Sequence, residues 1–166
     1  NSIFSDSLCT IIDIKNTSEK ELEIFFSDQI EHINDNIIVQ SNNTTLILDN
    51  IDFLNINYQK KLLFFLENND FFIKNKINIR QKITAISSKK IKDEISKGNF
   101  LQILYDRLSV IKLEVPSINS RREDIVPICE YYLNYYRKNK KYNFTFSKSA
   151  KIKLELYDWP GNISQI

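Results

Sequence analysis

The fold is decided by residues 44–67, TTLILDNIDFLNINYQKKLLFFLE. A short apolar run, Thr45 to Leu48, ends in the carboxylate of Asp49 and predicts a buried strand. The following segment, Asn57 to Glu67, has leucines at helical spacing and predicts an amphipathic helix. Its predicted apolar face consists of Leu62, Leu63 and Leu66. A strand followed by a helix that packs back onto it is typical of a parallel α/β sheet.

The same alternation continues on both sides of this stretch. Further strands are predicted at Thr10 to Ile14, Lys82 to Ser87 and Val110 to Leu113. A helix is predicted from Ser18 to Phe26, because Ser18 can cap it and acidic residues occupy its first turn. The sequence therefore predicts an α/β fold with a parallel sheet.

The chain changes character near Pro116 and becomes wholly helical. Helices are predicted at Arg122 to Lys138, with one apolar stripe, and at Ser147 to Tyr157, with Ser147 as the cap. We expect two parts: an α/β core over residues 1–116 and a small helical subdomain over residues 117–166.

Composition excludes several classes of protein. The 166 residues are 42% apolar and 27% charged, which is typical of a globular protein. No apolar run reaches the roughly 20 residues that span a bilayer, and no signal pattern opens the chain, so we expect a cytoplasmic protein with no membrane contact. The net charge of +2 favours no strong attraction to nucleic acid. Because the chain has no methionine, we expect it to be a piece of a longer protein.

The chemistry is expected at Asp49 and Asn50, where the buried strand ends. Carboxylates at strand ends are where α/β folds meet their ligands, and such a group can organise Mg²⁺. Asn50 can orient a water but cannot accept its proton, so we expect slow hydrolysis if a phosphoanhydride is the substrate. An Asp-Asn pair is also a common structural turn.

Five ordered motifs resemble one known family. Residues 46–71 (LILDNIDFLNINYQKKLLFFLENNDF) resemble G-T-L-F-L-D-E-I followed by Q-x-x-L-L-x-x-L-Q; residues 82–91 (KITAISSKKI) resemble R-I-I-A-A-T-N-R-D-L; residues 98–108 (GNFLQILYDRL) resemble G-x-F-R-x-D-L-Y-Y-R-L; residues 116–125 (PSINSRREDI) resemble P-P-L-R-E-R-x-E-D-I; and residues 159–166 (WPGNISQI) resemble W-P-G-N-V-R-E-L. Thr10 to Ser27 is a weaker match to F-V-A-V-N-C-A-A-L-P-E-x-L-x-E-S-E-L-F-G. The chain is thereby similar to the AAA+ domain of sigma-54-type bacterial response regulators of the nitrogen-regulation type.

The resemblance implies a ring-forming ATPase that acts on sigma-54 RNA polymerase, usually flanked by a receiver and a DNA-binding domain. Two family elements are missing from the sequence. It contains no G-x-x-x-x-G-K-[ST] phosphate loop, which we attribute to truncation. It also lacks the G-A-F-T-G-A loop that contacts sigma-54, because residues 28–43 are too short and chemically different.

The resemblance also assigns site residues. It implies that Asp49 holds Mg²⁺, that Ser88 stands at the first phosphate sensor, and that Arg107 is a finger reaching a neighbouring subunit's nucleotide. Leu101 replaces the other finger, and Ser164 replaces the sensor arginine of the helical subdomain. Arg107 could instead pair with Asp106 or Glu94, and the Trp159-Pro160-Gly161-Asn162 turn could simply anchor the helical subdomain.

The leading hypothesis is a domain that binds ATP and Mg²⁺ and self-associates as a ring or dimer, with impaired hydrolysis. In this hypothesis a sigma factor is a candidate partner, and DNA is bound through a missing C-terminal domain. The alternative is a catalytically dead pseudo-ATPase that transmits the receiver's state to a DNA-binding domain; Asn50, Leu101 and Ser164 favour it. A third hypothesis, an ATP-driven sigma-54 activator, requires residues 28–43 to replace the absent loop.

Overall fold

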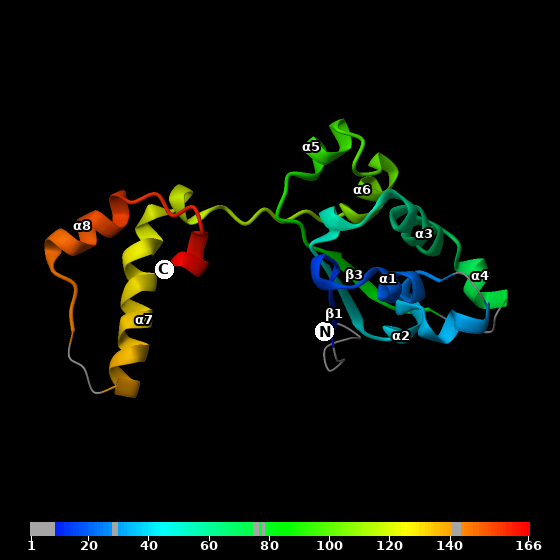
Figure 1. The fold of residues 1–166 in the computed structure, drawn as a ribbon, viewed down its shortest axis with the longest axis horizontal. Coiled ribbons are helices and arrows are strands. Elements are labelled where there is room, and N and C mark those ends of the chain that lie inside the picture. The colour runs from blue at the N-terminus through cyan, green and yellow to red at the C-terminus, as the bar shows by residue number, and fades with distance from the viewer. Residues whose placement is uncertain (1–8, 28–29, 75–76, 78, 141–143) are drawn as a thin grey trace. The chain divides into compact units, whose positions relative to one another are not determined.

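The computed structural model describes residues 9–27, 30–74, 77, 79–140 and 144–166. The chain divides into two compact units, Asn1–Lys112 and Leu113–Ile166. The first unit is built around a sheet and the second is helical (Figure 1). The boundary predicted between residues 116 and 117 stays a prediction.

The described part of the first unit has a sheet of three parallel strands in the order β1-β2-β3. These strands are β1 (Cys9–Asp13), β2 (Thr45–Asp49) and β3 (Lys82–Ala85). In the central strand, Leu46 and Leu48 are fully buried, and Thr45, Ile47 and Asp49 are half-buried. The predicted parallel α/β fold is therefore confirmed, with the apolar run before Asp49 at its centre.

Helices pack against the sheet in the first unit and make up the second unit. The first unit contains α1 (Glu19–Phe25), α2 (Ile37–Gln40), α3 (Ile56–Glu67), α4 (Asn69–Lys74), α5 (Ile91–Ser96) and α6 (Gln102–Leu108); the second contains α7 (Ile125–Lys140) and α8 (Lys148–Leu156). Short 3-10 turns occupy Ile14–Asn16, Ile30–Asp35, Ile51–Phe53, Ile118–Ser120, Arg122–Asp124 and Asn162–Gln165. Among the described residues, no helix is long and apolar enough to cross a bilayer.

Side-chain caps fix where the helices begin. Ser18 accepts a hydrogen bond from the backbone of Glu21, and the Glu21 carboxylate accepts one from the backbone of Ser18, which forms a capping box at α1. Asn55 caps α3, and Ser147 caps α8 through the backbone amide of Ala150. The caps predicted at Ser18 and Ser147 are therefore confirmed.

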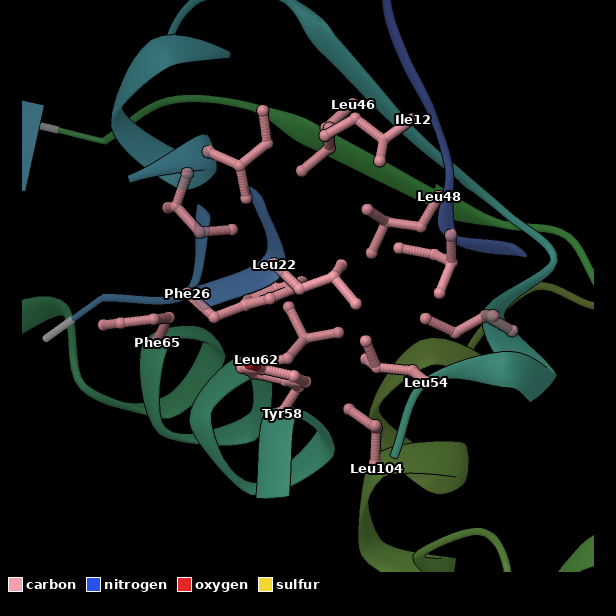
Figure 2. Close-up of a cluster of buried hydrophobic side chains, with 14 of the residues drawn as sticks. Ile12, Leu22, Phe26, Leu46, Leu48, Leu54, Tyr58, Leu62, Phe65 and Leu104 are labelled. Carbon is pink, nitrogen blue, oxygen red and sulfur yellow. The ribbon is translucent and has the colours of Figure 1, made fainter. Parts of the chain in front are cut away.

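The core of the first unit lies between the sheet and the helices. Figure 2 shows Ile12, Leu46 and Leu48 of the strands on one side and α1 and α3 side chains on the other. Leu62 is fully buried, and Leu63 and Leu66 pack partly buried against the same cluster. Each fully buried leucine contributes roughly 1.5–3 kcal/mol. The predicted apolar face of α3 is therefore correct at Leu62, but the buried face of the helix is completed by Tyr58, Gln59 and Phe65, and Leu63 and Leu66 lie at its border.

One predicted strand is wrong. Val110, Ile111 and Leu113 are 83%, 83% and 88% exposed, and the chain there has no regular structure. Their apolar and β-branched side chains favour extended backbone, but a strand also needs a neighbour for its N–H and C=O groups. No described strand pairs with this segment. The residue types of this segment therefore predicted its preference for extended backbone, but not whether a neighbouring strand would pair with it.

The second unit has a small core of Ile118, Ile125 and Cys129. The Trp159 indole donates to the carbonyl of Leu154 at 3.0 Å, and the Ile118 amide donates to the side chain of Asn162 at 2.9 Å. These bonds tie the Trp-Pro-Gly-Asn turn to the helices, so the anchoring interpretation of that turn is supported.

Exposure differs sharply among the side chains of α7 and β1. The four tyrosines of α7 are all exposed, from 40% to 68%: Tyr131, Tyr132, Tyr135 and Tyr136. Cys129 is a buried free thiol, whereas Cys9 is free and exposed. The spacing of aromatic side chains along a helix does not by itself bury them. Burial also needs a second layer of structure, and no described element covers the α7 tyrosines.

Candidate functional site

The three parallel strands bring their carboxyl ends to one edge of the sheet. Asp13 ends β1 and Asp49 ends β2, and the two residues are register partners in the parallel ladder. β3 ends at Ala85 on the other side of β2, and the Ile86 amide donates to the Leu48 carbonyl at 2.9 Å. The carboxylates of Asp13 and Asp49 therefore lie at the edge where parallel α/β sheets bind ligands, beside the loop that follows β3.

Asp49 and Asn50 form the turn that leaves this edge. The Asn50 amide donates to Oδ1 of Asp49 at 2.9 Å. Asn50 has φ 56° and ψ 42°, a left-handed conformation that asparagine tolerates better than most residues. The turn is further held by the Ile51 amide, which donates to the Ile86 carbonyl at 3.0 Å. Asp49 is thus half-buried in a fixed turn.

The Asn50 side chain reaches the neighbouring strand. Its Nδ2 donates to Oδ1 of Asp13 at 2.9 Å. Asp13 also accepts from the backbone amide of Lys15 at 3.1 Å and from Nδ2 of Asn16 at 2.5 Å. The Asn50 bond is the largest cause that lowers the pKa of Asp13 below its ordinary value of 3.8. The Asp13 carboxylate is therefore ionised at neutral pH and closely positioned.

A second polar cluster lies beside this turn, around Asp52. Its carboxylate is buried, and its Oδ1 accepts from the Ser87 hydroxyl at 2.9 Å. Lys89 Nζ lies 3.6 Å from Oδ2 and 4.7 Å from the centre of the exposed Phe53 ring. Lys15 Nζ lies 5.4 Å from the same ring. The hydrogen bond from Ser87 to the buried Asp52 carboxylate therefore holds the loop after β3 against the loop after β2.

Ser88 directly follows Ser87 and is exposed. The neighbouring Ser87 hydroxyl is used within the fold, since it also donates to the Lys89 carbonyl at 2.9 Å. Ser88 therefore lies on the solvent side of a loop that is anchored one residue before it. Its assignment as a phosphate sensor stays a prediction.

Arg107 is located elsewhere. Its guanidinium is exposed and donates to the carbonyl of Leu66, near the end of α3, at 3.1 Å. Leu66 lies near the end of α3, whereas Asn50 comes before its start. Because a helix of 12 residues is about 18 Å long, the length of α3 separates Arg107 from the turn at Asn50. Among the described residues, Arg107 forms neither of the two ion pairs considered for it. The Asp106 carboxylate accepts a hydrogen bond from Gln102, and the Glu94 carboxylate accepts hydrogen bonds from Lys97 and Asn99. The finger role of Arg107 stays a prediction.

The other replaced positions have structural surroundings. The Leu101 amide donates to Oε1 of the fully buried Gln59 at 2.8 Å, and the Leu101 side chain packs on the main core. The Gln59 amide group donates to the carbonyls of Leu54 and Asn99 at 2.6 and 2.9 Å. Gln59 therefore connects α3 to the segment before α6. Ser164 is exposed in the last 3-10 turn.

The residues at the sheet edge fit Mg²⁺ only as a site with few protein ligands, in which waters and substrate phosphates would complete the coordination. Asp49 and Asp13 offer hard oxygen donors, which Mg²⁺ prefers. Among the described residues, no group of three or more His, Cys, Asp or Glu forms a metal cage. Such sites suit an ion that keeps waters and is shared with substrate phosphates. Asp49 is the residue that would hold it, and the ion would neutralise charge on a transferring phosphoryl group.

Sequence reasoning selected Asp49 and Asn50 but missed Asp13. A signal was present, because Thr10-Ile11-Ile12-Asp13 repeats the form of Leu46-Ile47-Leu48-Asp49, an apolar run that ends in aspartate. Two strands that end in aspartate and pair in parallel place both carboxylates at one edge. The pairing itself, between residues 37 positions apart, is visible only in the folded chain.

A parallel sheet with carboxylates at its carboxyl edge, followed in the chain by a small helical unit, places this protein in the class of α/β domains with a helical subdomain. The chain belongs to the sigma-54 interaction domain family, whose model matches residues 13–118. The model of the AAA+ ATPase lid domain matches residues 119–166. The family resemblance seen in the motifs is therefore confirmed.

Similar proteins carry regulator names. A putative response regulator NtrX-like of Rickettsia typhi is 36% identical over 159 residues, covering 90% of this chain and 33% of the relative. The transcriptional regulatory protein ZraR of Salmonella typhimurium is 32% identical over 132 residues, covering 77% of this chain and 30% of the relative. The chain thus spans about a third of the length of these relatives.

Solved structures agree on the fold. The crystal structure of NtrX from Brucella abortus in complex with ATP has a TM-score of 0.81 at 19% identity and covers 97% of this chain and 39% of that one. The structure of the same protein in complex with ADP has a TM-score of 0.79 at 20% identity. At this identity, the likeness establishes the shared fold of the chain.

Proposed function

We propose that this chain is the AAA+ domain of a sigma-54-type transcriptional regulator, and that it binds ATP with Mg²⁺, self-associates, and hydrolyses ATP slowly. The observation that carries the proposal is the edge formed by Asp49, Asn50 and Asp13 on adjacent parallel strands. In this proposal the Asp49 carboxylate holds Mg²⁺, and the amide of Asn50 occupies the next position. Membership of the sigma-54 interaction domain family and the ATP complex of Brucella NtrX support it.

Within this proposal each site residue has one task. Asp49 holds Mg²⁺ beside the phosphates, and Ser88 meets a phosphate oxygen or its water from the loop after β3. Arg107 acts on the nucleotide of a neighbouring subunit in a ring or dimer. Its exposed position near the far end of α3 suits a group that works outside its own subunit.

The regulatory context is also a proposal, because the chain covers only about a third of its relatives. We infer a cytoplasmic two-component regulator in which other domains receive the signal and bind DNA. A sigma factor is the candidate partner by family membership. The G-A-F-T-G-A contact loop is absent from this sequence, and this absence argues against direct activation of sigma-54 RNA polymerase by this chain.

A second candidate function is favoured by specific residues. Asn50, Leu101 and Ser164 stand where the family motifs have a carboxylate and two arginines. Leu101 and its Gln59 anchor contribute to packing rather than to charge. These features suit a pseudo-ATPase that transmits a receiver's state to a DNA-binding domain without turnover.

The two candidates are separated by calorimetric titration of ATP into the full-length protein with Mg²⁺ present. We expect binding by the natural protein and at least tenfold weaker binding by Asp49→Ala, because the ion that bridges protein and phosphates loses its ligand. The exposed Asp93→Ala is the matched control and should bind like the natural protein. Absence of ATP binding in the natural protein would leave the pseudo-ATPase.

A further inference from the structure

The Asn50 side chain raises the question of which group acts on water at this edge. Hydrolysis of a phosphoanhydride needs an acceptor that orients the attacking water and takes its proton. An amide has an acceptor oxygen but cannot hold that proton at neutral pH. Asn50 therefore cannot complete this task, although it occupies the turn where the task is expected.

The carboxylate in contact with Asn50 is Asp13. The contact is direct, with Nδ2 of Asn50 2.9 Å from Oδ1 of Asp13. The two residues stand on paired strand ends, because Asp13 is the register partner of Asp49. Asp49 has another task in the proposed function, and its Oδ1 already accepts from the Asn50 amide. Asp13 thus brings a second carboxylate to the same edge.

We propose that Asp13 is the catalytic carboxylate of this domain and that Asn50 is its positioning residue. The inference rests on the proposed function, since it needs ATP bound at the edge that Asp49 marks. It replaces the expectation that the carboxylate role is lost with an assignment to the adjacent strand. In the family motif D-E, the glutamate of the turn both orients the attacking water and takes its proton. Here the amide of Asn50 and the carboxylate of Asp13, which stand at the ends of two adjacent strands, share this task.

The proposed step balances as ordinary hydrolysis. The oxygen of one water forms a bond to the γ-phosphorus while the bond from that phosphorus to the β,γ-bridging oxygen breaks. The electron pair of the broken bond leaves with ADP. The Asp13 carboxylate receives a proton from the attacking water and returns it to solvent, and inorganic phosphate is released; nothing is oxidised or reduced.

Hydrogen bonding at Asp13 leaves room for this role. Oδ1 accepts from Asn50 Nδ2 and from the Lys15 amide, which uses its two lone-pair positions. Oδ2 accepts from Asn16 Nδ2, which leaves it one further acceptor position. Asp13 is half-buried at the end of β1, and hydrogen bonds hold both of its carboxylate oxygens in place.

The electrostatics set the expected speed. The Asp13 carboxylate accepts hydrogen bonds from Asn50 Nδ2, Asn16 Nδ2 and the Lys15 amide. A carboxylate stabilised in this way is a weaker base than one in an apolar pocket, and general-base efficiency follows basicity. Slow but measurable turnover follows from this arrangement.

The experiment is single-turnover hydrolysis of [γ-³²P]ATP with Mg²⁺ by the full-length protein, with ATP affinity measured in parallel by calorimetry. Asp13→Asn keeps the size of the side chain and an acceptor oxygen for the Lys15 amide but removes the charge. We expect its hydrolysis rate to fall about 100-fold or more while its Kd for ATP stays within about threefold. The exposed Asp93→Asn is the matched carboxylate control and should change neither quantity.

A double variant separates a catalytic role from a merely structural one. Asp13→Asn with Asn50→Asp exchanges the two groups and returns a carboxylate to the turn, so we expect at least tenfold recovery over Asp13→Asn alone. Thermal unfolding of all variants tests that they fold. Recovery by exchange would not follow if Asp13 only capped the turn after β1.

The outcomes distinguish this inference from the proposed function. ATP binding with hydrolysis by Asp13→Asn within threefold of the natural rate overturns the catalytic assignment and leaves nucleotide binding intact. ATP binding with no hydrolysis by the natural protein has the same meaning. Failure of the natural protein to bind ATP overturns both. A loss in the single variant with recovery in the exchange supports Asp13 as the catalytic carboxylate.

Discussion

The two units differ in what holds them together. In the first unit, a large apolar cluster between sheet and helices lies below a polar edge. In the second, the buried cluster among the described residues is limited to Ile118, Ile125 and Cys129, with partly buried apolar side chains packed against it. Hydrogen bonds of the Trp-Pro-Gly-Asn turn add to this small core. The first unit can therefore carry altered site residues at its edge without losing its core, because edge and core share few side chains.

The largest expected effect breaks the core of the first unit. Leu62→Ala removes a fully buried side chain from the centre of the cluster between α3 and the sheet. We expect the free energy of unfolding to fall by about 3–5 kcal/mol, because transfer and cavity costs add. Urea unfolding of the 166-residue chain followed by far-ultraviolet circular dichroism measures the loss.

The control for this variant is Ile103→Ala on α6, where the side chain is 63% exposed. Its effect should stay within about 0.5 kcal/mol, as is usual for surface positions. A loss below about 1 kcal/mol for Leu62→Ala would contradict the described core.

An intermediate effect is expected at the polar connection inside the same unit. Gln59→Ala leaves the Leu101 amide and the Leu54 and Asn99 carbonyls without their buried partner. The expected cost is about 2–3 kcal/mol, because unsatisfied buried groups lose their solvation. Amide hydrogen exchange at Leu101 should accelerate together with the loss of stability.

Gln102→Ala tests that this effect comes from burial. Gln102 is exposed on α6 and donates to Asp106 at 2.7 Å. Exposed side-chain pairs contribute little, so the variant should unfold like the natural chain. Equal losses for both glutamine variants would refute the connecting role of Gln59.

The smallest effect is expected in the second unit, where a substitution of Trp159 tests how much one hydrogen bond of the Trp-Pro-Gly-Asn turn contributes to local stability. Trp159→Phe keeps an aromatic ring but removes the indole N–H that donates to the Leu154 carbonyl at 3.0 Å. One neutral hydrogen bond is worth about 1 kcal/mol, so hydrogen exchange of α8 amides should accelerate about fivefold. Exchange in β2 should not change.

Tyr131→Phe is the aromatic control, because Tyr131 is 68% exposed on α7. It should leave the exchange of α8 unaltered. If Trp159→Phe accelerated exchange in β2 as strongly as in α8, the two units would unfold together, and the contrast between them would not describe their stability.

Much of the fold and part of the site could be predicted from sequence. Apolar runs of strand length, helical spacing of leucines and the caps at Ser18 and Ser147 are local signals, and the structure contains those elements. Asp49 was found because it ends such a run. The strand predicted at Val110 to Leu113 failed because extended backbone also needs a hydrogen-bonding neighbour.

The sequence by itself determined the alternation of strands and helices, the family, and the replacement of a carboxylate by Asn50, because these depend on residue type and spacing. Only the tertiary structure decided that Asn50 meets Asp13, that Gln59 connects α3 to Leu101, and that Arg107 contacts Leu66. These contacts join residues about forty positions apart. Their formation depends on strand register and helix packing, which no local pattern encodes.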